Sequence, residues 1–278
     1  MKKVAVVVQV YKPEITDNEH ISLTQVRRVL SAYPVVLVTP PSMNVGAYRS
    51  LLGDQLAKVV TFPQRYFLGL HGYNRLLISK MYYKALIEYD FILIHHTDAF
   101  VFRDELEYWT EKDYDNIGAP IYQYDDTPNP ERYICTGNGG LCLRKVRTFL
   151  ELSTNYTRIY RFPDIAENFL RYNWRGRLYR APYYLLLLST LGSRLNTKLN
   201  RIKQNEDVIW GHYVPKYIEG FRSAPFEDGY RFSMEFNCSR LLALNNKQLP
   251  FGCHGWYRPM FKDFWKPYIE SFGYTIKN

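Results

Sequence analysis

The sequence predicts an α/β fold with a mostly parallel central sheet flanked by helices. Residues 4–10 and 35–39 are short runs dominated by Val, and residues 91–94 read Phe-Ile-Leu-Ile. Strands that lack polar alternation are typical of parallel sheets covered on both faces. Stretches of helical periodicity separate these runs, which is the alternation expected of such a sheet.

The first half of the chain supplies this alternation. After the first strand, residues 22–32 have helical periodicity, and Pro34 separates them from the second strand. A short third strand is expected at 59–62. The amphipathic stretch 73–89 predicts one helix, which leads into the strand at 91–94.

After residue 98 the predicted elements become shorter. We expect a helical turn at 106–109, a short strand at 114–120 and an exposed Asp- and Pro-rich loop at 123–132. A strand at 141–145, a helix at 146–152 and two late strands or extended loops at 232–236 and 250–256 should follow. The sequence shows no linker or repeat. One domain spanning residues 1–278 is therefore expected.

Composition limits the class of protein. Hydrophobic residues make up 46% and charged residues 23%, which is ordinary for a globular protein, whereas aromatic residues reach 17% and suit clefts for flat ligands. The four cysteines, Cys135, Cys142, Cys238 and Cys253, have neither CxxC nor zinc-type spacing. They predict reduced thiols in a cytoplasmic protein.

Positive charge is concentrated in residues 158–203. This segment carries ten basic and two acidic residues, so it holds most of the formal net charge of +9. Leucines and aromatic residues are interspersed with the basic ones. Such a mixture suits an anionic membrane surface or a phosphate-bearing partner, but also a solvated helical hairpin packed on the domain. No nucleic-acid motif accompanies the charge, so no nucleic-acid partner is expected.

Polar clusters that could bind a ligand occur at three places in the sequence. Thr97 and Asp98 come directly after the strand at 91–94, Glu206 and Asp207 precede a predicted helix, and His254 lies in a late strand. Ligands of open α/β sheets bind at the carboxyl ends of strands. Each acidic cluster could instead cap a helix.

Five short sequences, taken in their order along the chain, resemble the GT-A family of nucleotide-sugar glycosyltransferases. The chain looks closest to a bacterial group of glycosyltransferase-like domains whose function was long unassigned. The resemblance runs from residue 4 to about 256 and is carried by residues 96–102, 114–120, 137–145, 206–208 and 249–254. It implies a GT-A, Rossmann-like fold, here with a basic helical insertion around 158–203.

The resemblance implies a divalent metal, Mn²⁺ or Mg²⁺, that holds the donor diphosphate. In the family an Asp-x-Asp motif supplies the ligand, and Asp98 matches its last Asp. His96 stands in place of the first Asp, which removes one carboxylate. His254 matches the family's C-terminal metal-binding His, and a hydrogen-bonded core histidine is the alternative. Of His95 and His96, one must face away from the cleft, because adjacent strand residues point to opposite sides.

The resemblance also assigns catalytic and sugar-binding roles. Asp207 matches the general base of inverting members, with Glu206 as the alternate, and a helix cap is the other interpretation. The sugar and the acceptor are assigned to a glycine-rich loop and one aromatic residue: Gly137, Asn138, Gly139, Gly140 and Trp256. A tight turn before a strand would also need such glycines.

The nucleotide is expected over the first strands. Tyr11 could stack on the base, and Thr39 ends the second strand nearby. The remaining donor-binding candidates are Asn74, Arg75, Lys80, Thr97 and Asp98.

Together these residues predict a glycosyltransferase of the hexosyltransferase type (EC 2.4 class). It would move a sugar from a nucleotide-sugar to a hydroxyl of a glycan or lipid-linked glycan, with inversion. We expect it in the cytoplasm, with peripheral contact to the inner face of the membrane through 158–203 as one interpretation. A degenerate carbohydrate-binding or scaffold protein and a nucleotidyltransferase are the alternatives. The latter should have a Gly-rich phosphate loop near the N-terminus, and residues 8–13 contain no glycine.

Overall fold

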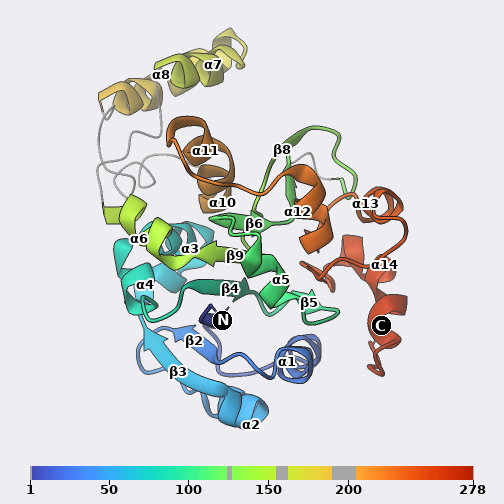
Figure 1. Cartoon of the computed structure of the whole chain (residues 1–278). Helices are drawn as coiled ribbons and strands as arrows, with labels where there is room; N and C mark the ends of the chain where they lie inside the picture. Colours follow the sequence, from blue (N-terminus) through green and yellow to red (C-terminus); the bar gives the residue numbers. More distant parts are fainter. Residues whose placement is uncertain (1, 124–126, 155–161, 190–204, 278) are drawn as a thin grey trace.

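A six-stranded sheet with the order β3-β2-β1-β4-β9-β6 forms the centre of the computed structural model, which describes residues 2–123, 127–154, 162–189 and 205–277 (Figure 1). Neighbouring strands among the first four in this order are parallel, and β9 runs antiparallel to both β4 and β6. The strands are β1 (Val4–Gln9), β2 (Val35–Thr39), β3 (Leu56–Thr61), β4 (Phe91–His95), β6 (Asn116–Gly118) and β9 (Leu141–Lys145). The predicted α/β class with a mostly parallel sheet is confirmed.

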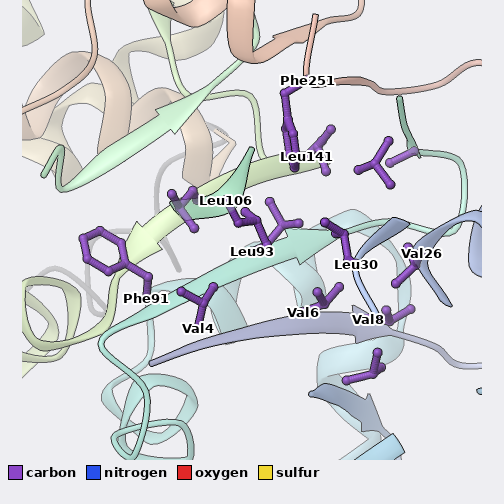
Figure 2. Close-up of a cluster of buried hydrophobic side chains, with 14 of the residues drawn as sticks. Val4, Val6, Val8, Val26, Leu30, Phe91, Leu93, Leu106, Leu141 and Phe251 are labelled. Atoms are coloured by element: carbon purple, nitrogen blue, oxygen red, sulfur yellow. The ribbon is translucent and has the colours of Figure 1, made fainter. Parts of the chain in front are cut away.

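Alternate residues of these strands enter two different cores. Val4, Val6 and Val8 of β1 pack with α1 (Asp17–Val29), α2 (Gly46–Leu52) and α5 (Leu106–Glu111), as Figure 2 shows in part. Ala5 and Val7 face the other core, which contains α3 (Gly69–Ile78), α4 (Lys80–Ala85) and α6 (Val146–Thr154). Helices therefore cover both faces, which explains why the strands lack polar alternation.

Two predicted helix boundaries were wrong. The first helix begins at Asp17, five residues before the expected start, because Thr16 and Glu19 form a reciprocal capping box. The single helix expected at 73–89 is divided into α3 and α4 at Ser79, whose backbone is extended. The Ser79 hydroxyl donates to the Leu76 carbonyl, so the side chain takes the place of the next helical hydrogen bond.

Short elements of the second half bring the C-terminal part of the chain to the end of β4. The predicted late strands are only two residues each, and they pair with the strand that follows residue 98 in a sheet of order β10-β11-β5. The strands and helices outside the central sheet and its helices are β5 (Phe100–Val101), β7 (Pro120–Tyr122), β8 (Tyr133–Thr136), β10 (Ser233–Met234), β11 (Gly252–Cys253), η1 (Gly53–Gln55), η2 (Gln64–Phe67), η3 (Ile209–Tyr213), α10 (Glu206–Val208), α11 (Val214–Tyr217), α12 (Phe226–Phe232), α13 (Cys238–Leu244) and α14 (Pro259–Glu270).

The basic insertion is helical where the structure describes it. Helices α7 (Phe162–Leu170) and α8 (Trp174–Ser189) pack together at one end of the molecule (Figure 1). The remaining parts of 158–203 lie outside the described residues. No described helix has the length and apolar character needed to span a bilayer. All four cysteines are free and buried, as expected for reduced thiols.

Candidate active site

The turn after β4 carries the first group of candidate residues. His95 is fully buried, and burial lowers the pKa of its imidazole to about 4, so the ring is neutral. His96, Thr97 and Asp98 are partly exposed, and His96 lines a cavity of about 1000 Å³. The sequence argument that only one of the two histidines faces the cleft is thus confirmed, and that histidine is His96.

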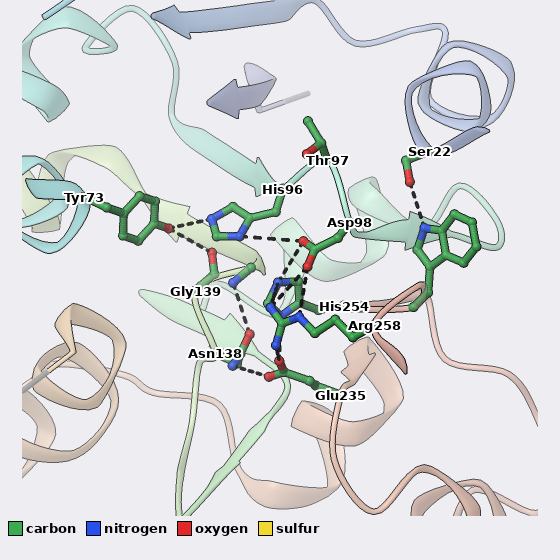
Figure 3. Close-up of polar contacts among 12 residues, drawn as sticks. Ser22, Tyr73, His96, Thr97, Asp98, Asn138, Gly139, Glu235, His254 and Arg258 are labelled. Carbon is green, nitrogen blue, oxygen red and sulfur yellow. Dashed lines mark hydrogen bonds and ion pairs between the residues drawn. The ribbon is translucent and has the colours of Figure 1, made fainter. Parts of the chain in front are cut away.

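Strand β11 places His254 beside this turn, because it pairs antiparallel with β5, which follows Asp98. His254 Nε2 lies 3.1 Å from Asp98 Oδ1, and His96 Nδ1 lies 4.0 Å from the same oxygen (Figure 3). One ligand atom from each of the three side chains fits within 4.8 Å of the others. Residues 156 positions apart in the chain therefore form one cluster.

Two further side chains complete the cluster. Glu235 Oε1 lies 3.2 Å from His254 Nδ1, and Arg258 contacts Glu235 Oε1 at 2.6 Å and Asp98 Oδ2 at 3.1 Å. Burial lowers the pKa of His254, but the carboxylates of Asp98 and Glu235 outweigh this and raise it to about 10. Conversely, His254 holds the pKa of Asp98 well below its usual range, although burial opposes ionisation. Without a bound cation, the cluster is an ion-pair network.

The donor atoms suit a divalent transition-metal ion. Two imidazole nitrogens and a carboxylate oxygen are ligands that manganese-type ions accept. The 3.1 Å between His254 Nε2 and Asp98 Oδ1 matches neighbouring ligands of one ion at about 2.1 Å, the distance typical of a small octahedral ion. A metal requires the neutral ring, so its binding would release the proton of His254. The residues present therefore fit the expected metal.

The glycine-rich loop lies directly against this cluster. A Cβ at Gly140 would be 2.0 Å from His254 Nε2, so only glycine leaves room for the imidazole. Asn138 donates to Glu235 Oε2 at 2.6 Å and accepts from the Gly140 N–H. Gly137 has φ of +112° and would meet Asn116, so it shapes the turn behind the cavity and does not line it.

On the other side of the same loop, α10 presents the acidic pair. Asp207 is partly exposed in the cavity and accepts from the Gly139 and Val208 N–H groups at 3.3 and 2.8 Å. Burial raises the pKa of Asp207 above its ordinary value, although these two hydrogen bonds oppose the shift. The result is a carboxylate that is more basic than a free one.

Glu206 has a different environment. It is 1% exposed and forms two contacts with the fully buried Arg144, at 2.8 and 2.9 Å, while its own N–H donates to Asn74 Oδ1. Burial raises the pKa of Glu206 to about 7, and Arg144 opposes this shift. Glu206 thus holds α10 in place against β9 and α3.

Several predicted site residues lie elsewhere. Trp256 was assigned to the sugar, but its ring is fully buried and its Nε1 donates to Ser22. Thr39 is 1% exposed, and its hydroxyl donates to the Pro40 carbonyl. Lys80 is exposed at the start of α4, beyond the first turns of α3 that face the cavity. The structure does not bring these three side chains to the cavity, because position in the sequence near a strand end or a helix start does not fix which way a side chain points.

The remaining donor candidates are distributed differently. Asn74 lines the cavity, but its side-chain amide is hydrogen-bonded to the Asn205 side chain and to the Glu206 N–H. Thr97 donates to Glu19 outside the cavity wall, and the 61% exposed ring of Tyr11 also lies outside it. Tyr11 and Arg75 stay predictions.

Sequence reasoning missed four side chains of the site. Tyr73 contacts His96 Nε2 through its hydroxyl at 2.8 Å, and Arg144, Glu235 and Arg258 make the ion pairs described above. Only Arg258 had a local signal, since it follows His254 by four residues. Glu235 lies within a stretch that predicts a strand, and the sequence does not show that β10 and β11 are neighbours.

Comparison with known proteins gives a family match and similarity to distantly related solved structures. Residues 56–254 match the model of a family described as "Protein of unknown function (DUF5672)". No curated protein matches the sequence. The chain is similar to mouse xyloside xylosyltransferase 1 in its apo form, with 12% identity and a TM-score of 0.48, over 91% of this chain and 97% of that one.

The galactosyltransferase LgtC in complex with donor and acceptor sugar analogues is similar at 11% identity and a TM-score of 0.48, over 99% of this chain and 97% of that one. A cytidylyltransferase from Leptospira borgpetersenii serovar Hardjo-bovis (strain JB197) has 12% identity and a TM-score of 0.36, over 59% of this chain and 67% of that one. Likenesses this distant leave the activity to be inferred from the site. The family match spans most of the sequence, and the chain belongs to the DUF5672 family of proteins of unknown function.

Proposed function

We propose that this protein is a glycosyltransferase that uses a nucleotide-sugar donor. One observation carries the proposal: a cluster suited to a divalent cation and a carboxylate of raised pKa face the same cavity from the two sides of one glycine loop. His254 contacts the loop at Gly140, and Asp207 contacts it at Gly139. This is the separation of tasks that sugar transfer from a diphosphate needs.

The donor diphosphate belongs at the cationic side. His96, Asp98 and His254 would hold Mn²⁺ or Mg²⁺, which neutralises charge on the leaving diphosphate when bound. Arg258 lines the cavity and adds a guanidinium that can pair with phosphate oxygens. Asn138 lines the cavity between the two sides, and it would bond sugar hydroxyls with the amide hydrogen and the oxygen lone pair that Glu235 and Gly140 do not use.

Asp207 is the proposed general base. It would take the proton of an acceptor hydroxyl while that oxygen forms a bond to the anomeric carbon and the bond from this carbon to the diphosphate oxygen breaks. A direct displacement of this kind inverts the anomeric configuration. Glu206 is the weaker candidate, because its carboxylate is paired with Arg144 and is only 1% exposed.

The proposal extends to the whole chain and to its acceptor. One domain, residues 1–278 with the insertion at 158–203, would carry the reaction. The acceptor would be a hydroxyl of a glycan or lipid-linked glycan. The transfer reaction would take place in the cytoplasm, at the inner face of the membrane.

The test is a panel of nucleotide-sugars with Mn²⁺, in which release of free nucleoside diphosphate is measured for the wild type and for Asp207→Asn. With the productive donor, Asp207→Asn should lose about 10²–10⁴-fold in rate. Asp263→Asn is the matched control, since Asp263 is an exposed carboxylate on α14. Near-full activity of Asp207→Asn would exclude it as the base.

A second candidate function has one observation in its favour. Arg258 already pairs with Asp98 and Glu235 and lies 3.2 Å from His254 Nε2, so the cluster is electrically satisfied without a metal. A carbohydrate-binding or scaffold protein could retain such a network. Thermal shifts with a panel of nucleoside diphosphates, with and without Mn²⁺, discriminate the two: stabilisation by none of them favours the scaffold.

A further inference from the structure

Helix α8 has an exposed apolar face in addition to its buried one. Its most exposed large apolar side chains are Trp174 (69%), Leu178 (72%), Tyr179 (86%) and Leu185 (65%), with Leu186 at 45%. Its buried side is formed by Tyr184 and the partly buried Leu188, which belong to the core under α3, α4 and α6. So many exposed apolar side chains on one helix indicate a surface that binds a partner.

Helical geometry gathers the exposed residues into one stripe. At about 100° per residue, Trp174, Leu178 and Leu185 lie within roughly 40° of one another, and Tyr179 and Leu186 extend the same side. Counted from Trp174, the five exposed residues span an arc of about 140°, whereas the buried Tyr184 and the partly buried Leu188 lie outside this arc, at about 280° and 320°. The stripe therefore faces outward along most of α8, away from the core.

The charges beside the stripe are all positive. Residues 171–189 contain Arg171, Arg175, Arg177 and Arg180 and no acidic residue. Arg180 stacks over the Tyr172 ring at 4.3 Å, and Arg177 donates to the Leu170 carbonyl. The sequence on either side, 155–161 and 190–204, adds six basic residues and no acidic one. An occupant of this face should be anionic as well as apolar.

The turn that joins α7 to α8 borders the candidate active site. Arg171 and Tyr172, in the turn between α7 and α8, line the cavity that holds His96 and Asp207. A surface bound to α8 would therefore lie close to the cavity. Because the exposed face of α8 lies next to the cavity, a partner that carries an acceptor to the site fits this face better than one that only covers its apolar side chains.

We propose that the outward face of α8 docks onto an anionic lipid bilayer. Tryptophan, tyrosine and leucine are the residues that enter the interfacial region, and arginines bind anionic headgroups. A second copy of the chain fits less well, because a two-fold interface would bring the arginines of one α8 against those of the other. The docking does not depend on the transfer reaction and can be measured without any turnover.

Vesicle binding of the full-length protein tests the docking. The probes are sedimented vesicles of phosphatidylcholine alone and of phosphatidylcholine with phosphatidylglycerol. Trp174 also provides a local signal: all five tryptophans are described, and the other four are at most 2% exposed. We expect binding to the anionic vesicles with a blue shift of Trp174 fluorescence, and weaker binding at high salt.

Matched substitutions locate the contact. Leu178→Glu should weaken binding at least tenfold, whereas Leu244→Glu, at an exposed leucine of α13, should leave it unchanged. Each of Arg175→Gln and Arg180→Gln should cost about fivefold, which corresponds to about 1 kcal/mol per cation near an anionic surface. Arg240→Gln is the charge control.

Three outcomes would overturn the proposal. They are equal or absent binding to both kinds of vesicle, unchanged binding by Leu178→Glu, and a concentration-dependent dimer of the wild type that Leu178→Glu abolishes without any vesicle binding. Because Leu178 is 72% exposed, its variant should unfold at the wild-type temperature, and this measurement confirms that a loss of binding is not a loss of fold.

Discussion

Gly140→Ala should disable the cation cluster by displacing one imidazole. The added Cβ would lie 2.0 Å from His254 Nε2 and 2.1 Å from its Cε1. To reach ordinary contact at about 3.4 Å, the ring must retreat by about 1.4 Å. The backbone of Gly140 is not in the left-handed region, so the imidazole is the main obstacle to alanine.

His254 has little freedom to retreat. The ring is buried and is held at 3.1 Å from Asp98 and 3.2 Å from Glu235. Overpacking costs about 1–3 kcal/mol, and the loss of one charged hydrogen bond about 1.5–3 kcal/mol. A total near 3 kcal/mol corresponds to a fall in melting temperature of roughly 6–9 °C. A displacement of about 1 Å at a reacting centre costs on the order of 10²-fold in rate.

Isothermal titration with Mn²⁺ and thermal unfolding measure both effects. Gly140→Ala should bind Mn²⁺ at least tenfold more weakly. Gly46→Ala at the start of α2 should not, because the new Cβ meets only the exposed Asn44 side chain, 3.1 Å from its Oδ1, and that side chain can move. In the double variant Gly140→Ala/His254→Ala the clash is absent, so the two destabilisations should be less than additive. Wild-type Mn²⁺ affinity and melting temperature in Gly140→Ala would refute the reasoning.

Three further predictions concern the groups around the cavity. Arg144→Leu leaves the Glu206 carboxyl buried without its partner and should lower the free energy of unfolding by about 3–5 kcal/mol in urea titrations, against less than about 0.5 kcal/mol for the exposed Arg147→Leu. Burial raises the pKa of Glu206 from 4.5 to about 7, so the contribution of its protonated carboxyl to stability is complete below pH 4.5 and is lost as the pH rises to 7. The free energy of unfolding of the wild type, relative to that of Glu206→Gln, should therefore fall between pH 4.5 and 7. A difference that stays constant over this range would contradict the pKa shift. Asp98→Asn should weaken Mn²⁺ binding at least tenfold by calorimetry, and an unchanged affinity would place the ion elsewhere.

Local pattern predicted the elements of the sheet well. The strands predicted at 4–10, 35–39 and 91–94 are present as β1, β2 and β4. Buried parallel strands need apolar side chains on both faces, and this requirement is visible in any short window. The helix break at Ser79 was not visible, because a serine is compatible with both a continuing helix and a side-chain bond to the preceding turn. The early start of α1 had a sequence signal in Thr16 and Glu19 that apolar periodicity alone overlooks.

The sequence by itself determined the α/β class, the position of Asp98 at the end of a buried strand, the acidic pair and the basic insertion, because each depends on residues close together in the chain. Only the tertiary structure decided which of these residues meet. It brought His254, Glu235 and Arg258 to Asp98 through the pairing of β11 with β5 and β10, and it buried Trp256 in a core. It also paired Glu206 with the buried Arg144 and left Asp207 partly exposed in the cavity. Long-range strand pairing and side-chain direction depend on the packing of the whole chain, so no local pattern could reveal them.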